Sequence, residues 1–262
     1  MKILKRKILL ALSLPVDFFK RKEGFSYQPY SYFYFLLQFK QSSIRTAIGQ
    51  LVKSGEIDKI SRNNVPYFRL TGVGRARLLS FFPIALGQSR VWDGRWRIIV
   101  NVDRKIKEPK LREFGFKRLA RGVFITPLPV STQIKDFLLD KNLLGKVILL
   151  ETRRFLAPDD EKIAKKHWQL EGLVIKYAIF VKQCRRLLKR INRQKRLENR
   201  DKKEVVDLFD AYFLLLSHDP GLPKKLLADD WPGDFARKVF LKIFDRLKMD
   251  KGLISFDILY YS

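Results

Sequence analysis

The sequence SSIRTAIGQLVKSGEIDKISRNNVPYFRLTGVGRARLL, at residues 42–79, decides the fold of the N-terminal part of the chain. Its first third predicts a helix, because apolar residues recur at intervals of three and four and form one continuous face: Ile44, Ala47, Ile48, Leu51 and Val52. Ser42 or Ser43 can cap a helix that starts at Ile44, since a serine hydroxyl accepts from the unpaired N–H groups of the first turn. Ser54-Gly55 is expected to end it, because glycine is the usual left-handed cap.

A hairpin and a closing helix are predicted to follow. Two short strands, one around Ile57 and Ile60 and one over residues 67–70, flank Arg62-Asn63-Asn64, where asparagine tolerates positive φ and makes a tight turn. Thr71-Gly72 then leads into a helix over Val73–Phe82. These parts in this order predict a winged helix-turn-helix over residues 1–88. The aromatic run 27–35 indicates a core helix beneath it, with a base-stacking platform as the alternative.

The polar side of the helix at residues 44–53 predicts contact with duplex DNA. A winged helix would place this side in the major groove and the hairpin on the backbone or minor groove. The residues expected to read bases are Arg45, Thr46 and Gln50. The residues expected to contact phosphates or the backbone are Ser42, Ser43, Lys53, Arg62, Asn63 and Asn64. An ordinary amphipathic core helix is the alternative for this helix taken alone.

The net charge favours a polyanionic partner. The chain has 262 residues, with 54 Lys and Arg against 27 Asp and Glu, a net charge of +27 and a pI of about 10.2. Nucleic acid is the first expectation and an acidic membrane surface the second. A non-specific basic binder therefore rivals a sequence-reading regulator. Residues 182–203 hold 11 basic and 2 acidic side chains, which fits either a solvated helix end or a phosphate-contacting surface.

Cysteine and histidine counts exclude several kinds of site. One cysteine rules out an internal disulfide framework and an all-cysteine zinc site, and two histidines leave little for a histidine-built centre. We expect no cofactor, and the single thiol favours a cytoplasmic protein. The N-terminus resembles a short signal peptide, but its apolar block is brief, and an amphipathic core helix is favoured. Its apolar side holds Ile3, Leu4, Ile8, Leu12 and Leu14. No apolar run approaches the ~18 residues of a membrane span.

Residues 89–157 predict a small α+β domain. Strands are expected at Trp96–Val102, Gly122–Ile125 and Lys146–Leu150, with helix-compatible stretches at Pro109–Arg118 and Gln133–Leu139. This alternation at this size indicates a ferredoxin-like layer of helices on a sheet. Asp103, just past the first strand, suggests an alternative function as a metal-dependent nuclease. The more ordinary interpretation is a strand-end carboxylate that bonds a turn.

Residues 158–262 are predicted to be helical. Asp159 or Asp160 is expected to cap a long helix from Glu161, whose apolar stripe would run from Trp168 to Ile191 and bury Cys184 as an apolar filler. The stretch 205–216 is expected to pack against it as an antiparallel hairpin. The loop 219–233 holds three prolines and two glycines, which indicates a specified rather than a flexible connection, and a further amphipathic helix over residues 234–247 follows.

Three signatures in order make the chain resemble the PaaX family, the repressors of phenylacetate catabolism and their relatives. The first is Ile44-Arg45-Thr46-Ala47 with Gly55 and the run Tyr67-Phe68-Arg69-Leu70-Thr71-x-x-Gly74. The second is Trp92-Asp93-Gly94-Arg95-Trp96-Arg97, followed by Gly115-Phe116 and Gly122-Val123-Phe124-Ile125-x-Pro127. The third is Trp168, Tyr177, Asp219-Pro220-x-Leu222-Pro223 and Asp230-Trp231-Pro232-Gly233.

The resemblance implies a transcriptional repressor rather than an enzyme. Family members are homodimers released from operator DNA by an acyl-CoA, which we expect to bind between the central and helical domains, with Trp168, Tyr177 and Trp231 as effector or structural signature residues. The central domain of the family is similar to the small nuclease of CRISPR adaptation and serves assembly rather than cutting. A dimer would place two recognition helices ~34 Å apart on B-DNA.

Overall fold

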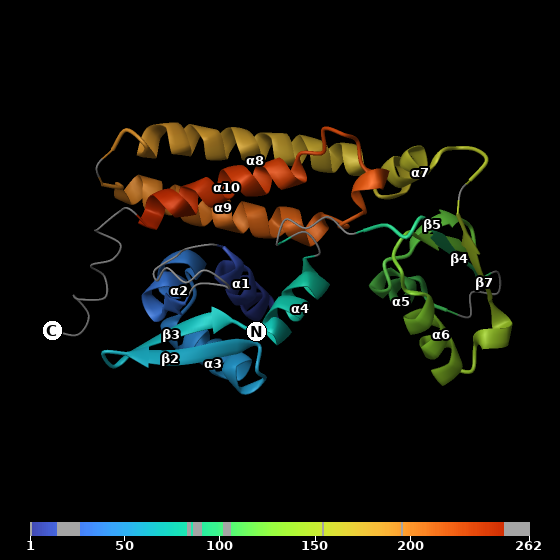
Figure 1. Cartoon of the computed structure of the whole chain (residues 1–262), viewed down its shortest axis with the longest axis horizontal. Coiled ribbons are helices and arrows are strands. Elements are labelled where there is room, and N and C mark those ends of the chain that lie inside the picture. The colour runs from blue at the N-terminus through green and yellow to red at the C-terminus, as the bar shows by residue number, and fades with distance from the viewer. Residues whose placement is uncertain are drawn as a thin grey trace. The chain divides into compact units, whose positions relative to one another are not determined.

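The computed structural model describes residues 2–14, 27–82, 85, 91–101, 106–153, 155–194 and 196–248. It is a mixed α and β fold with two small antiparallel sheets (Figure 1). Contacts divide the chain into two units, each made of separate segments. Unit 1 holds residues 1–88, 174–219 and 232–262, and unit 2 holds residues 89–173 and 220–231. Parts of residues 158–262 therefore belong to each unit. The division of the chain into three domains at residues 88/89 and 157/158 stays a prediction.

Unit 1 begins with three helices, the second and third of which pack against the first. The helices are α1 (Lys2–Ser13), α2 (Tyr30–Leu37) and α3 (Gln41–Lys53). The predicted apolar side of α1 is buried except at Ile3, which is 61% exposed. The prediction for Ile3 is wrong because this residue lies in the first turn of α1, whereas continuous burial begins only at Lys7. The Tyr32 hydroxyl of α2 donates to the carbonyl of Ala11 at 2.9 Å, which joins α2 to the end of α1.

A three-stranded antiparallel sheet follows α3. Its strands are β1 (Gln28–Pro29), β2 (Ile57–Arg62) and β3 (Val65–Leu70), in the order β1-β3-β2. The register pairs Ile57 with Leu70 and Arg62 with Val65 across a two-residue turn. The turn residues Asn63 and Asn64 have φ of 47° and 61°, and positive φ at both positions suits the right-handed twist of a hairpin. The predicted hairpin and its turn are confirmed.

Helix α4 (Gly72–Phe81) is fixed to the base of the hairpin by its first turn. Thr71 caps it by accepting a hydrogen bond from the N–H of Gly74, and the Thr71 hydroxyl donates to the carbonyl of Gly55 at 2.7 Å. A Cβ atom on Gly74 would lie 2.0 Å from the carbonyl oxygen of Glu56. The Thr71-x-x-Gly74 pattern therefore lets the helix start touch the backbone that follows α3.

Three longer helices complete unit 1: α8 (Leu170–Ile191, from Val174 on), α9 (Asn199–His218) and α10 (Gly233–Lys248). Phe180, Tyr212 and Phe240, one from each helix, have ring centroids within 4.7–5.5 Å of one another. Arg190 of α8 pairs with Asp201 and Glu204 of α9. Cys184 is fully buried, as predicted, and burial raises the pKa of its thiol to about 12.

The long helix predicted from Glu161 to Ile191 is wrong at one point. Asp159 does cap a helix, accepting from the N–H of Lys162 at 2.8 Å, but α7 (Asp160–His167) ends at His167 and α8 begins at Leu170. Gln169 adopts a positive φ of 52°, which breaks the helical path without a glycine or a proline. The apolar stripe continues across this break, so the periodicity alone did not reveal it.

Unit 2 is a four-stranded antiparallel sheet with helices on it. The strands β4 (Trp96–Val100), β5 (Lys117–Ala120), β6 (Val123–Thr126) and β7 (Ile148–Thr152) have the order β5-β6-β4-β7. Helices α5 (Glu108–Glu113) and α6 (Ser131–Asp140) follow β4 and β6, and one-turn helices occupy Leu144–Lys146 and Lys224–Leu226. The helix expected over Pro109–Arg118 is too long, because β5 begins at Lys117.

The two faces of this sheet carry separate cores. Ile99 and Phe124 pack with Leu111 of α5 and with Ile134 and Leu138 of α6. Trp96 and Ile125 pack on the other face with a cluster from α7 and the loop before α10: Ile163, Ala164, Trp168, Leu222 and Leu226. The constrained loop 219–233 thus contributes apolar side chains to the interior of unit 2.

Candidate nucleic-acid interface

One side of α3 is buried and the other faces solvent, as the spacing predicts. Ile44, Ala47 and Ile48 are 0% exposed and Leu51 is 1% exposed, whereas Val52 is half-buried. Most of the residues predicted to contact DNA from this helix are exposed: Ser42, Ser43, Arg45, Thr46 and Lys53. Gln50 is half-buried. Short polar and basic groups therefore line a continuous outer side of α3.

The start of α3 differs from the prediction. The helix begins at Gln41 rather than Ile44, its N-cap is Lys40, and no side chain caps it. The N–H of Ile44 bonds the carbonyl of Lys40 at 3.1 Å, so the backbone satisfies the group that a serine cap would have served. Ser42 and Ser43 therefore stand in the first turn, where their side chains project to solvent.

Arg45 is held by two aromatic residues of α2. Its Nε donates to the hydroxyl oxygen of Tyr34 at 2.7 Å, and its guanidinium carbon lies 5.8 Å from the ring centroid of Tyr30. The rings of Tyr30 and Tyr34 stack at 5.8 Å with 13° between their planes. Sequence reasoning assigned this aromatic run to the core, which is correct for the buried Phe33 but missed the contacts of the tyrosines with Arg45. The spacing of four residues places the two tyrosines on the same side of α2, and this spacing could have predicted that they act together.

The hairpin beside α3 presents its turn to solvent. Asn63 and Asn64 are exposed at the tip, and Arg62, the last residue of β2, is half-buried. Arg69 pairs with Asp58 across the two strands at 2.7 Å and lies over the ring of Tyr27 at 4.7 Å. The cross-strand pair fixes the base of the hairpin, and the tip is left with short polar side chains.

The three signature residues of the C-terminal part divide between the two units. Trp168 and Trp231 pack in the same cluster of unit 2, with the Trp168 ring 6.0 Å from that of Trp96. Tyr177 belongs to unit 1, where it is 0% exposed and donates to Asp219 Oδ2 at 2.7 Å. Burial and the neighbouring Asp219 carboxylate raise the pKa of Tyr177 well above its usual range. In each unit these side chains contribute to the interior.

The tryptophan- and arginine-rich signature at residues 92–97 builds the core of unit 2. Trp96 is fully buried and its indole N–H donates to Asp160 Oδ1 at 2.7 Å. Arg97 is 4% exposed and pairs with Asp93 and with Glu151. Hydrogen bonds from Arg97 hold the pKa of the Asp93 carboxyl below its usual range. The tryptophan and arginine residues of this signature are thus accounted for by contacts inside unit 2.

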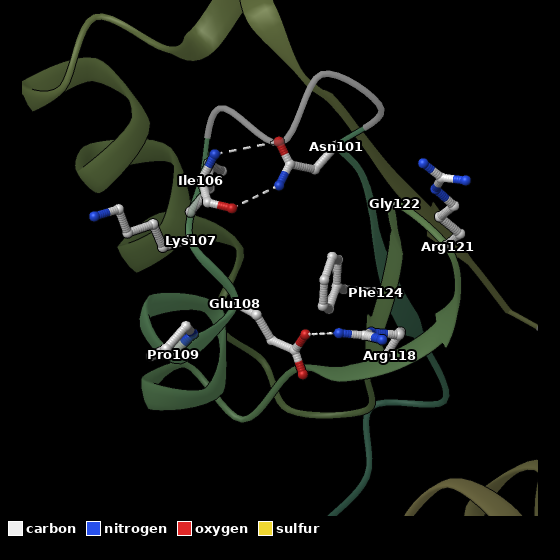
Figure 2. Close-up of a pocket in the computed structure, with 9 residues that line it drawn as sticks. All are labelled: Asn101, Ile106, Lys107, Glu108, Pro109, Arg118, Arg121, Gly122 and Phe124. Atoms are coloured by element: carbon white, nitrogen blue, oxygen red, sulfur yellow. Dashed lines mark hydrogen bonds and ion pairs between the residues drawn. The ribbon is translucent and has the colours of Figure 1, made fainter.

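A cavity of about 580 Å³ lies in unit 2 between α5 and the β5–β6 turn (Figure 2). The side-chain amide of Asn101 bonds both backbone groups of Ile106, and the Phe124 ring forms an apolar wall. Three cationic residues and one carboxylate border the cavity: Lys107, Arg118, Arg121 and Glu108. Glu108 is engaged by Arg118 and Arg112, which lower the pKa of its carboxyl. The border of the cavity therefore carries a net positive charge.

Asp103, the centre of the nuclease alternative, lies outside the described residues. The next two carboxylates after it in sequence, Glu108 and Glu113, are engaged by Arg118 and Lys110 respectively. Across the residues that the structure describes, no three His, Cys, Asp or Glu side chains gather as a metal ion would require. No helix in the described ranges combines the length and apolar character needed to cross a bilayer.

Comparison with known proteins shows similarity to a family model, to a repressor and to a solved structure. Residues 168–251 match the family model of the PaaX-like protein C-terminal domain. Over 222 residues the chain is 22% identical to the transcriptional repressor PaaX of Escherichia coli (strain K12), covering 80% of this chain and 70% of that protein. The uncharacterized protein Rv0674 from Mycobacterium tuberculosis aligns with a TM-score of 0.46 and 20% identity, over 96% of this chain and 99% of that chain. The first two similarities support a PaaX-like transcriptional regulator.

Proposed function

We propose that the chain is a cytoplasmic, sequence-specific DNA-binding repressor. The observation that carries this proposal is the exposed polar side of α3 next to a hairpin whose Asn63-Asn64 tip is also exposed. In a winged helix-turn-helix, such a helix enters the major groove while the hairpin contacts the backbone or minor groove. The net charge of +27 supplies the long-range attraction to DNA. The similarity to the PaaX repressor supports the same function.

The residues on α3 and the hairpin divide between two roles. Arg45, Thr46 and Gln50 read base edges, and the tyrosine contacts of Arg45 restrict the directions from which its guanidinium approaches the groove. Restricting a side chain before binding lowers the entropy lost in the complex. The residues assigned to phosphate and backbone contacts are Ser42, Ser43, Lys53, Arg62, Asn63 and Asn64.

Unit 2 is proposed as the assembly module. Its elements follow the order β-α-β-β-α-β with strands arranged β5-β6-β4-β7, which supports a ferredoxin-like layer. Two copies joined through such modules would form a homodimer with recognition helices one turn of B-DNA apart, ~34 Å. Palindromic half-sites at that spacing are the corresponding expectation for the operator.

An acyl-CoA-type effector is proposed to release the repressor. We place its anionic part in the cavity of unit 2, rather than between the central and helical domains as the sequence suggested, because Lys107 and Arg121 border this cavity while Phe124 offers an apolar wall. Ligand sites are typically concave and mostly apolar, with a few polar or charged groups that fix the orientation of the ligand. The effector would act by binding the DNA-incompatible state more tightly than the DNA-bound state.

The deciding experiment is a footprint on the DNA upstream of the gene that encodes this chain, with and without a panel of acyl-CoA compounds. A discrete protected site that bulk genomic DNA competes away only at ~10³-fold excess or more supports a sequence-reading regulator. Protection without a preferred site would instead support the rival function of a non-specific basic binder, which the charge of +27 favours. Release of the footprint by one acyl-CoA, lost on Lys107→Gln/Arg121→Gln, would support the effector site.

A further inference from the structure

The solvent-facing side of α8 carries a row of cations. Lys182, Arg186, Lys189 and Arg193 are all exposed, and their spacing of four, three and four residues places them on one side of the helix. Arg193 continues this side past the last helical residue, because its N–H bonds the carbonyl of Arg190 at 3.1 Å. The opposite side of α8 is buried through Phe180, Cys184, Leu187 and Ile191, which are 0–2% exposed. We call the four cations the α8 stripe.

The charge of the α8 stripe is not neutralised by its surroundings in the described residues. Residues 174–197 contain nine Lys and Arg and no Asp or Glu. Two neighbouring cations do have partners: Arg190 pairs with Asp201 and Glu204 of α9, and Arg185 lies over the ring of Phe235 at 4.9 Å. The side chains of the stripe, in contrast, form no ion pair with any described carboxylate. The fold thus provides partners for Arg185 and Arg190 and leaves the stripe itself to solvent.

The dimensions of the stripe suit a phosphate backbone. With a rise of about 1.5 Å per residue, Lys182 and Arg193 are separated by about 16 Å along the helix axis. A DNA strand places one phosphate every 3.4 Å or so of duplex axis, so about five phosphates fall within that length. Four like charges fixed along a helix repel one another, and a polyanion that lies along them removes this cost and releases counterions.

Helices α8 and α3 lie at opposite edges of unit 1. In Figure 1, α8 lies along one edge of this unit and α3 with the hairpin along the other, with α9, α10, α1 and α2 between them. Contacts between α9 and α2 agree with this layering. A straight duplex held in its major groove by α3 therefore cannot reach the stripe of the same unit.

We infer that the α8 stripe is a second nucleic-acid contact, which binds the phosphate backbone of a DNA segment other than the one contacted by α3. One molecule would then hold two duplex segments, one by base-reading contacts and one by charge alone. The inference rests on the proposed function only for the first segment, because the second contact requires no operator.

The test is a two-duplex capture assay with the full chain. A mixed-sequence duplex is tethered to beads, the protein is added, and the retention of a second, fluorescent mixed-sequence duplex is measured over a range of salt. The stripe variant is Lys182→Gln/Arg186→Gln/Lys189→Gln/Arg193→Gln. The control variant, Lys135→Gln/Lys141→Gln/Lys146→Gln/Lys166→Gln, removes the same charge from exposed lysines of unit 2.

We expect the stripe variant to lose most of the capture of the second duplex while still protecting the upstream site in a footprint. Its slope of log affinity against log salt for mixed-sequence DNA should fall by about 3–4, because each lost phosphate contact removes about 0.9. The control variant should keep the capture. Equal capture by both variants overturns the inference. Binding to phosphatidylserine vesicles is measured in parallel, and a stripe variant that loses vesicle binding but keeps the capture of the second duplex overturns it as well. If the parent protein protects no discrete site while the two variants still differ in capture, the result counts against the proposed function alone.

Discussion

The Nε of Arg45 donates a hydrogen bond to the hydroxyl of Tyr34 across 2.7 Å, and this contact joins the exposed side of α3 to α2. Arg45 is the longest side chain among the three that we propose to read bases, so it would otherwise sample the most rotamers. Its position above the Tyr30 ring adds a second restraint. The pair links an aromatic run that the sequence assigns to the core with the surface proposed to enter the groove.

The Tyr34→Phe variant should weaken base discrimination without weakening general DNA binding. It removes the acceptor for Arg45 and keeps the ring that stacks on Tyr30. We expect a loss of up to about 1 kcal/mol in the preference for the operator over single-base variants at one position. The measurement is competitive binding with an operator series. In an Arg45→Ala background the same change should have no effect, and an undiminished effect there would show that Tyr34 acts by another route.

Arg45→Ala and Lys53→Ala should separate base reading from phosphate contact. Loss of Arg45 should relax the base preference at one operator position by about 1–3 kcal/mol. Loss of Lys53 should weaken binding to all duplexes alike and reduce the salt slope by about 1. Titrations of both variants against the operator and a scrambled duplex measure these effects. If both variants bind the operator as the parent does, α3 is not the recognition helix.

Gly74→Ala should destabilise unit 1. The added methyl group would lie 2.0 Å from the carbonyl oxygen of Glu56, so the start of α4 must move away from the base of the hairpin. We expect a loss of about 1–3 kcal/mol in the free energy of unfolding, measured by urea denaturation. Gly72→Ala, two residues earlier in the same helix, meets nothing within 4 Å and should be neutral or stabilising by up to about 1 kcal/mol. Equal effects of the two changes would contradict the close approach at Gly74.

Two buried tyrosines of the helical layer should respond oppositely to loss of the hydroxyl. Tyr177→Phe removes the donor to Asp219 and should cost about 1–3 kcal/mol, because a buried carboxylate loses a hydrogen bond. The Tyr212 hydroxyl is buried and has no hydrogen-bond partner among the described residues, so Tyr212→Phe should be neutral or stabilising. Thermal unfolding of both variants provides the comparison. A larger loss for Tyr212→Phe would mean that its hydroxyl has a partner.

Local patterns predicted the helix and hairpin at residues 42–79 because each depends on nearby residues. The apolar spacing of α3, the stop at Gly55 and the Asn63-Asn64 turn all appear as expected. Strand β5 was missed because its side chains are mostly exposed, so Lys117–Ala120 shows no apolar alternation. The break at Gln169 carries no breaker residue.

Local sequence patterns could not predict contacts between residues that are far apart in the sequence. The grouping of residues 174–219 with residues 1–88 depends on pairs such as Phe82 and Phe213, whose rings lie 5.3 Å apart. The contact of Tyr34 with Arg45 joins two helices, and it could not be predicted because neither residue stands out in the sequence of its own helix.

The construction of unit 1 from the first and last parts of the chain has a consequence during synthesis. Lys7 of α1 meets Asp210 of α9 at 2.5 Å, and Arg237 of α10 donates to the carbonyl of Ala85. When residues 1–88 have left the ribosome, only part of unit 1 has been made. Their contacts with α9 and α10 can form only after unit 2 and these later helices have been synthesised. Under the proposed function, a product that lacks α8 to α10 would therefore not compete with the complete protein for the operator.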